Sequence, residues 1–160
     1  MKPPQVREGD PPFQDLILSV FHLSNVLSVA GDQLVADLGL TSARWQVLGA
    51  LAVTPAQPVA WIARDLQSTR QNIQRIVNDL ERAGFVALRP NPHHKRAQLV
   101  EMTPEGHRVF ELAASRGGPW AQHAAAGLSQ DDVDVVRQVL HAIGTAVENY
   151  DYPSLPENPA

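Results

Sequence analysis

The segment Ser68–Gly84 constrains the fold more than any other part of this chain. Its apolar residues recur at i, i+3, i+4 and i+7, the spacing of one buried face of an α-helix: Ile73, Ile76, Val77 and Leu80. Ser68 or Thr69 fits the cap at its start, and Ser68 with Gln71 matches a capping box. Gly84 stands where a left-handed residue would end the helix. The sequence therefore predicts one amphipathic helix over this segment.

The other face of this helix is polar and basic in its first two turns, with Thr69, Arg70, Gln71, Asn72, Gln74 and Arg75. Arginine makes bidentate hydrogen bonds to guanine, and glutamine and asparagine make them to adenine. Threonine can contact a phosphate or a thymine methyl group. A lone helix with such a face is more often simply solvated. The neighbouring segments decide between these two interpretations.

The segments on either side predict a winged helix-turn-helix. Pro58 opens a short helix with apolar residues at helical spacing, and a tight turn at Gln67-Ser68 joins it to the next helix. Two β-like runs follow, residues 85–89 and 98–102, with a basic tip between them. They predict a two-stranded wing.

Longer helices are predicted outside this unit. Residues 13–34 are apolar on more than one stripe, so this helix requires more than one neighbour. Thr41 or Ser42 would cap the next helix, and Thr103-Pro104 starts another after the wing. The latter is expected to break or kink at residues 117–119, Gly-Gly-Pro. The last helix is predicted from Val133 to about Tyr150.

Composition narrows the class of protein. The 160 residues suit one globular domain, with 44% hydrophobic residues, no apolar run near the ~18 residues of a membrane span, and no cysteine. Although the net charge is −4, residues 58–98 hold seven basic and three acidic side chains. That segment is thus +4 and the remainder is −8. A basic middle between acidic ends favours a nucleic-acid partner. From the absence of cysteine and of an apolar run near the length of a membrane span, the chain is expected in the cytoplasm.

In this order of elements, the chain resembles the MarR family of bacterial regulators over about residues 13–150. The most specific matches are T-R-Q-N-I-Q-R-I-V-N-D-L-E-R-A-G-F-V in the centre and L-V-E-M-T-P-E-G after the wing. The resemblance implies a mostly α fold with a small β-wing. The implied parts are dimerisation helices (13–40 and 104–150), a winged DNA-binding domain (41–103), an irregular arm (1–12) and an irregular tail (151–160).

The resemblance also implies a function. The protein would be a homodimeric repressor that binds double-stranded DNA at a pseudo-palindromic operator and is released by a small aromatic or phenolic anion. Ser68, Thr69 and Arg70 would contact chiefly phosphates, and the base-reading set would be Gln71, Asn72, Gln74 and Arg75. The wing would add His93, His94, Lys95 and Arg96, with Arg96 at the minor groove or backbone.

One wing residue departs from the family pattern. His94 stands where an acidic residue usually orients the wing arginine. Two outcomes stay open: looser binding by the wing, or tighter binding below about pH 6.5, where imidazole gains a proton.

Other kinds of site find less support. By position alone, an effector crevice would include His22, Asn25, Arg44, Trp45 and Leu48. The six histidines lack metal-ligand spacing, so no metal or cofactor is expected. No nucleophile elbow or phosphate loop occurs, which disfavours an enzyme. Trp45 and Trp61 are interpreted as packing residues. The alternative from another class is a winged-helix module that binds protein without DNA, which would carry an apolar or acidic recognition face.

Overall fold

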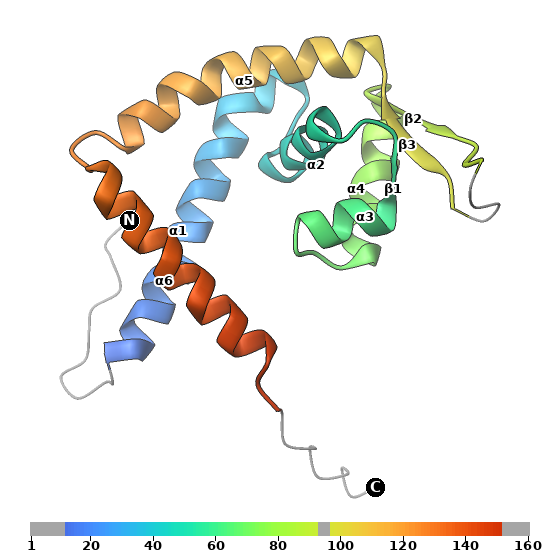
Figure 1. Cartoon of the computed structure of the whole chain (residues 1–160). Coiled ribbons are helices and arrows are strands. Elements are labelled where there is room, and N and C mark those ends of the chain that lie inside the picture. Colours follow the sequence, from blue (N-terminus) through green and yellow to red (C-terminus); the bar gives the residue numbers. More distant parts are fainter. Residues whose placement is uncertain (1–11, 93–96, 152–160) are drawn as a thin grey trace, which may run out of the picture. The chain divides into compact units, whose positions relative to one another are not determined.

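The computed structural model describes residues 12–92 and 97–151, and the chain divides into two compact units, Met1–Pro119 and Trp120–Ala160. The elements follow in the order α1 (Pro12–Val35), η1 (Ala36–Leu38), α2 (Ser42–Val53), β1 (Gln57–Pro58), α3 (Val59–Asp65), α4 (Arg70–Arg82), β2 (Val86–Arg89), β3 (Leu99–Met102), α5 (Pro104–Ala124) and α6 (Gln130–Glu148) (Figure 1). The expected mostly α fold with a small wing is confirmed. Residues 1–11 of the predicted arm and 152–160 of the predicted tail lie outside the described residues.

The small sheet has three antiparallel strands in the order β1-β3-β2, one more than the two-stranded wing predicted. β2 pairs with β3 from Val86 opposite Met102 to Arg89 opposite Leu99, and β1 adds Gln57 opposite Val100. The third strand escapes sequence reasoning because it is two residues long. Its second residue, Pro58, is also the N-cap of α3.

The core of the first unit lies among α2, α3, α4 and the sheet. Its largest fully buried apolar residues come from each of these elements and from the end of α1: Val35, Val47, Leu48, Leu51, Ile62, Ile73, Val77, Leu80 and Val100. Because the apolar stripe of α4 is fully covered here, its opposite face is turned to the outside. This packing positions the candidate site.

α5 begins in close contact with the end of α4. The Thr103 hydroxyl donates to the Gly84 carbonyl at 2.7 Å, and the Thr103 backbone N–H donates to the Phe85 carbonyl at 3.0 Å. The same hydroxyl accepts from Gly106 N–H at 3.0 Å, which confirms Thr103 as the cap of this helix. A Cβ on Gly106 would overlap the Phe85 carbonyl oxygen. Glycine therefore permits this close approach.

Residues 117–119 were expected to break or kink this helix, and the break is wrong: α5 continues as a helix to Ala124, with Pro119 inside it. The two glycines there have different surroundings. A Cβ on Gly117 would lie 2.5 Å from Cη2 of the Trp45 indole, whereas a Cβ on Gly118 would meet nothing within 4 Å. Gly117 is thus needed for the packing of Trp45 rather than for ending the helix. The prediction of Trp45 as a packing residue is confirmed.

These surroundings predict opposite effects for two neighbouring substitutions. Gly117→Ala should lower the free energy of unfolding by about 1–3 kcal/mol, because the indole ring must move to admit the methyl group. Gly118→Ala should raise it by about 0.5–1 kcal/mol, since alanine has the higher helix propensity. Urea unfolding followed by tryptophan fluorescence measures both. Equal effects of the two substitutions would contradict this account.

A bidentate ion pair fastens the later part of α5 to the end of α1. Arg116 Nη1 and Nη2 lie 2.5 and 2.9 Å from the two carboxylate oxygens of Asp37, and Nη1 also donates to the Leu34 carbonyl at 3.0 Å. The hydrogen bond from Arg116 lowers the pKa of Asp37 below its usual value. A bidentate arginine–carboxylate pair fixes the relative orientation of the two side chains as well as adding attraction between them.

α1 is exposed and strongly apolar. Judged by length and composition alone, the segment Phe13–Leu38 is long and apolar enough to cross a membrane, because an 18-residue window within it has a mean hydropathy of 1.3. The expectation that no apolar run approaches this length is therefore wrong, because uncharged polar residues such as His22 and Asn25 interrupt the run without lowering its average enough. The exposed apolar residues include Phe13, Leu18, Phe21, Leu23, Leu27 and Val29.

α6 in the second unit is also apolar at its surface. Ser129 and Asp132 form a capping box at its start, and the hydrogen bond from Ser129 lowers the pKa of Asp132. No residue of α6 is buried, and its exposed apolar residues are Val133, Val135, Val136, Val139, Leu140 and Val147. Apolar surface this extensive usually marks an interface.

Candidate nucleic-acid interface

One left-handed residue ends α3 just before α4 begins, and a second one ends α4. Before it, Gln67 (φ +48°) closes α3: Gln67 N–H donates to the Arg64 carbonyl and Ser68 N–H to the Ala63 carbonyl. After it, Gly84 (φ +76°) repeats the arrangement, with Phe85 N–H donating to the Leu80 carbonyl at 2.9 Å. Both are Schellman motifs. The turn between α3 and α4 is thereby fixed by backbone hydrogen bonds.

Thr69 is the N-cap of α4, and its hydroxyl accepts from Asn72 N–H at 3.2 Å. The predicted capping box between Ser68 and Gln71 is wrong. The Ser68 hydroxyl accepts instead from the side-chain amide of Asn72 at 3.1 Å. The helix begins one residue later than that box requires, and Gln71 is exposed.

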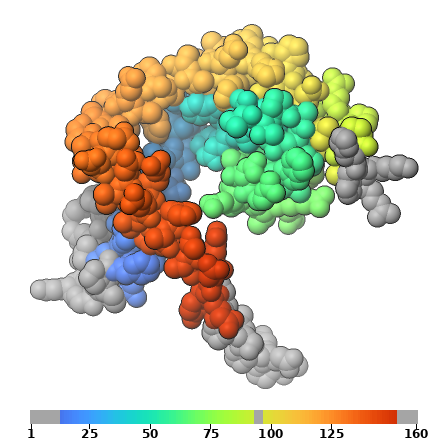
Figure 2. Space-filling view, in the orientation of Figure 1, coloured from blue at the N-terminus to red at the C-terminus, as the bar shows by residue number. Residues whose placement is uncertain are grey.

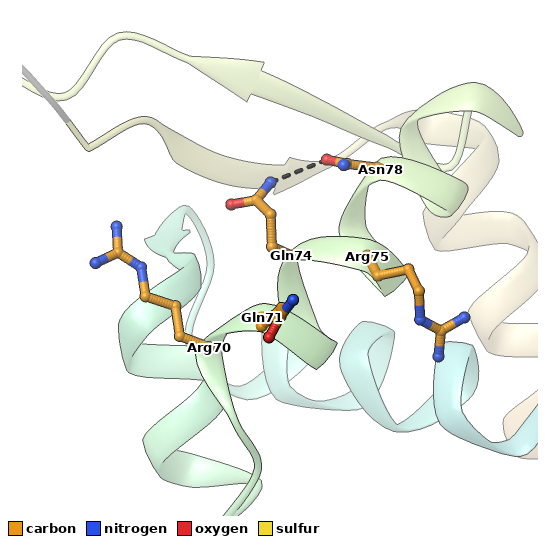
Figure 3. Close-up of a pocket in the computed structure, with 5 residues that line it drawn as sticks. All are labelled: Arg70, Gln71, Gln74, Arg75 and Asn78. Atoms are coloured by element: carbon orange, nitrogen blue, oxygen red, sulfur yellow. Dashed lines mark hydrogen bonds between the residues drawn. The ribbon is translucent and has the colours of Figure 1, made fainter. Parts of the chain in front are cut away.

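The exposed face of α4 carries the side chains singled out from the sequence. Arg70, Gln71, Gln74 and Arg75, together with Asn78, line a shallow depression of about 550 Å³ (Figure 3). Asn78 was missed, although its position four residues after Gln74 places it on the same face. The Gln74 side-chain amide donates to Asn78 Oδ1 at 2.9 Å. In the space-filling view, α3 and the turn that leads from it into α4 (green) lie at the surface (Figure 2).

Hydrogen bonds organise the polar side chains of this face. Arg75 Nη2 donates to Asn72 Oδ1 at 3.1 Å, and Asn72 in turn donates to Ser68. Within the described part of the chain, the side chains of Arg70 and Gln71 make no such bond. Donors and acceptors therefore project from two successive turns, which is what recognition of base edges and phosphates requires.

A second, smaller hollow joins this face to the base of the wing. It has a volume of about 120 Å³ and is lined by Arg70 and Gln74 of α4, the start of α3, Leu88 of β2, and residues 97–98. At the wing, Arg89 Nε donates to Glu101 Oε2 at 3.1 Å across the paired strands. The predicted wing contacts His93, His94, Lys95 and Arg96 lie outside the described residues.

The proposed effector residues lie on α1 and α2. Asn25 is exposed and His22 half-buried on α1, whereas Leu48 is fully buried in the core. Arg44 Nη1 donates to the Gly39 carbonyl at 3.1 Å. In the described ranges, no group of three histidine, aspartate or glutamate side chains is placed to hold a metal ion. Trp61 was expected to pack but is 53% exposed on α3, so that prediction is wrong.

Comparison with known proteins places this geometry in a family. A sequence profile of the MarR family matches residues 38–97, which run from the last residue of η1 through α2, the helix-turn-helix and the wing strand β2. The chain belongs to the MarR family. It is accordingly a DNA-binding transcription regulator, and the family is one of regulators rather than enzymes.

Relatives of this MarR-family chain include two curated proteins and one solved structure. An uncharacterised protein of Mycobacterium bovis is 39% identical over 101 residues, covering 63% of this chain and 70% of the relative. The transcriptional activatory protein BadR of Rhodopseudomonas palustris is 36% identical over 102 residues, covering 62% and 58%. The PcaV transcriptional regulator of Streptomyces coelicolor, solved with its natural ligand, has a TM-score of 0.77 at 21% identity, covering 88% and 99%. This last similarity concerns the fold.

Proposed function

We propose that this chain is a cytoplasmic homodimeric repressor that binds a pseudo-palindromic operator and is released by a small-molecule effector. The observation that carries the proposal is the face of α4 opposite its buried stripe, where Arg70, Gln71, Gln74 and Arg75 project together beside the base of the wing. Residues 41–103 would form the DNA-binding domain, and residues 13–40 and 104–150 the dimerisation helices. The exposed apolar surfaces of α1 and α6 support the latter assignment.

On α4 the proposed DNA contacts are assigned from the position of each side chain, and on the wing they are assigned from the resemblance to the MarR family. Gln71, Asn72, Gln74 and Arg75 would read base edges in the major groove. The N-terminal end of α4 suits phosphate, because Thr69 and Arg70 stand where helix N–H groups and the helix dipole attract anions. The wing residues His93, His94, Lys95 and Arg96 would hold the adjacent minor groove or backbone.

Selection of duplexes from a random pool by the purified protein, followed by sequencing, tests the reading mode. Two inverted half-sites about one helical turn apart are expected, because a dimer presents its two recognition helices to successive major grooves. A single half-site would contradict binding by a dimer, and the absence of any salt-dependent retention of DNA would support the module that binds protein. Transcription in vitro from a promoter carrying the selected site then distinguishes repression from the activation that the name of BadR describes.

Arg75→Ala should weaken binding to the selected duplex by about 1–3 kcal/mol and relax preference at one base position, because a bidentate base contact is lost. Arg96→Ala should weaken binding similarly on all sequences and reduce the salt slope by about 1. Competition gel shifts at several salt concentrations measure both quantities. Wild-type affinity and base preference in Arg75→Ala would contradict the base-reading role.

The effector would be a small aromatic or phenolic anion that enters between α1 and α2. Of the proposed residues, His22, Asn25, Arg44 and Trp45 are exposed or partly exposed, whereas Leu48 is buried. Arg44 supplies a positive charge and Trp45 an aromatic face. Release of DNA requires only that the effector prefer the unbound form by about 1–3 kcal/mol. Titrating salicylate and benzoate against the protein–DNA complex is a direct first test.

A further inference from the structure

A single carboxylate, that of Asp79 on α4, faces three arginines. Arg44 of α2 places Nη2 at 3.5 Å from Asp79 Oδ2, and Arg75 places Nη1 at 4.0 Å from the same oxygen. Arg82, one turn further along α4, pairs with Oδ1. Two cations therefore share Oδ2, and one of them is the arginine proposed to read a base.

The two arginines that share this oxygen are held very differently. The Arg44 side chain is 30% exposed and has a second anchor, because Nη1 donates to the Gly39 carbonyl at 3.1 Å. The Arg75 side chain is 70% exposed, and its distance to the carboxylate is at the outer limit of an ion pair. Arg44 is a fixed counter-ion, whereas Arg75 is free to exchange partners.

This difference matters when DNA arrives. To bond a base, Arg75 must leave Asp79 and Asn72. A fixed positive charge beside Asp79 weakens the attraction of this carboxylate for Arg75. Without Arg44, Asp79 would hold Arg75 on the surface of the protein.

We propose that Arg44 and Asp79 are positioning residues that set how readily Arg75 transfers from the protein to a base. The proposal rests on the base-reading role assigned above to Arg75. Asp79 gives Arg75 a competing partner wherever the matching base is absent, and this sharpens discrimination between bases. Arg44 keeps that competition weak enough for the matching base to prevail.

A double-mutant cycle tests this on the duplex that the wild-type protein selects from a random pool. Arg44→Gln should weaken binding about tenfold. Asp79→Asn added to the same chain should remove nearly all of that loss, so that the double variant binds within about twofold of Asp79→Asn alone. Arg44→Lys, which keeps the charge, should bind within about threefold of wild type. Arg108→Gln, which opens an exposed pair with Glu105 on α5, is the matched control and should leave affinity unchanged.

A second background separates positioning from direct contact. In Arg75→Ala, the further change Arg44→Gln should alter affinity less than about twofold, since its effect passes through Arg75. Additive losses in either cycle would overturn the proposal, and so would a tenfold loss that Asp79→Asn does not relieve. Asp79→Asn alone should also flatten base preference at the position that Arg75 reads, which a purely structural role would not change.

Failure of the underlying assignment would look different. If Arg75→Ala binds and discriminates as wild type does, the base-reading role of Arg75 is wrong, whatever the cycles give. If Arg75→Ala loses affinity while both cycles are additive, only the positioning role fails. Urea unfolding of every variant identifies any that is destabilised. If Arg44→Gln is destabilised, the base preference of Asp79→Asn alone decides the proposal: an unchanged preference at the position that Arg75 reads would overturn it.

Discussion

Val136→Glu should convert the proposed homodimer into monomers at micromolar concentration and lower its affinity for a duplex with two half-sites by about 100-fold or more. Val136 lies on the apolar stripe of α6 and is 56% exposed in the single chain. Burying a carboxylate without a partner in a subunit interface costs several kcal/mol, and the twofold symmetry of a dimer doubles that cost. Light scattering during size-exclusion chromatography measures the assembly, and gel shifts measure the binding.

A control on the same helix makes the comparison specific. Gln138→Glu introduces the same charge on the opposite side of α6, about 200° away around the helix at 100° per residue. It should leave both assembly and affinity as in wild type. Affinity for a single half-site should change little in either variant, because it depends on one winged unit. A Val136→Glu protein that remains dimeric would exclude α6 from the interface.

Gly106→Ala should lower the free energy of unfolding by about 3 kcal/mol, the upper end of the range for overpacked sites. The added methyl carbon would overlap the Phe85 carbonyl oxygen and lie 2.9 Å from the carbonyl carbon, so backbone rather than a flexible side chain has to move. Phe85 could move only by giving up the hydrogen bond from Thr103 N–H to its carbonyl.

The matched control is Gly118→Ala, in the same helix but with open space around the added atom. Urea unfolding followed by tryptophan fluorescence should show the two midpoints moving in opposite directions. Because the contact with Phe85 lies directly after α4, Gly106→Ala should also weaken DNA binding at temperatures where the protein is still folded. A stability within about 0.5 kcal/mol of wild type would show that the start of α5 can shift without loss.

Sequence patterns predicted the part of the fold that local chemistry determines. Apolar spacing located α4, and the left-handed Gly84 and the Thr103 cap marked helix ends correctly. Patterns of neighbouring residues gave a wrong prediction where a residue far away in the sequence determines the local structure. The Gly-Gly-Pro stretch suggested a break, but Trp45 packs against Gly117 and α5 continues. Nothing in the sequence near residue 117 indicates the indole that makes the glycine necessary.

The candidate site shows the same division. The polar face of α4 follows from spacing, since covering one stripe of a helix exposes the other. The partners of those side chains do not follow. Asp79 looks like an ordinary exposed acid in sequence, yet it meets Arg44 from a helix more than thirty residues earlier. Trp61 has a side chain of the kind that usually packs, but among the residues that the structure describes it stays half-exposed on α3.

The first four turns of α5 are fastened to the winged unit at both ends. Thr103 bonds the residues that follow α4, while Gly117 and Arg116 hold α2 and the end of α1. Held at two places, this part of α5 cannot tilt separately from the winged unit. Any signal that reorients the proposed recognition helix α4 must therefore move the winged unit and the first four turns of α5 together as one rigid body, rather than bend α5.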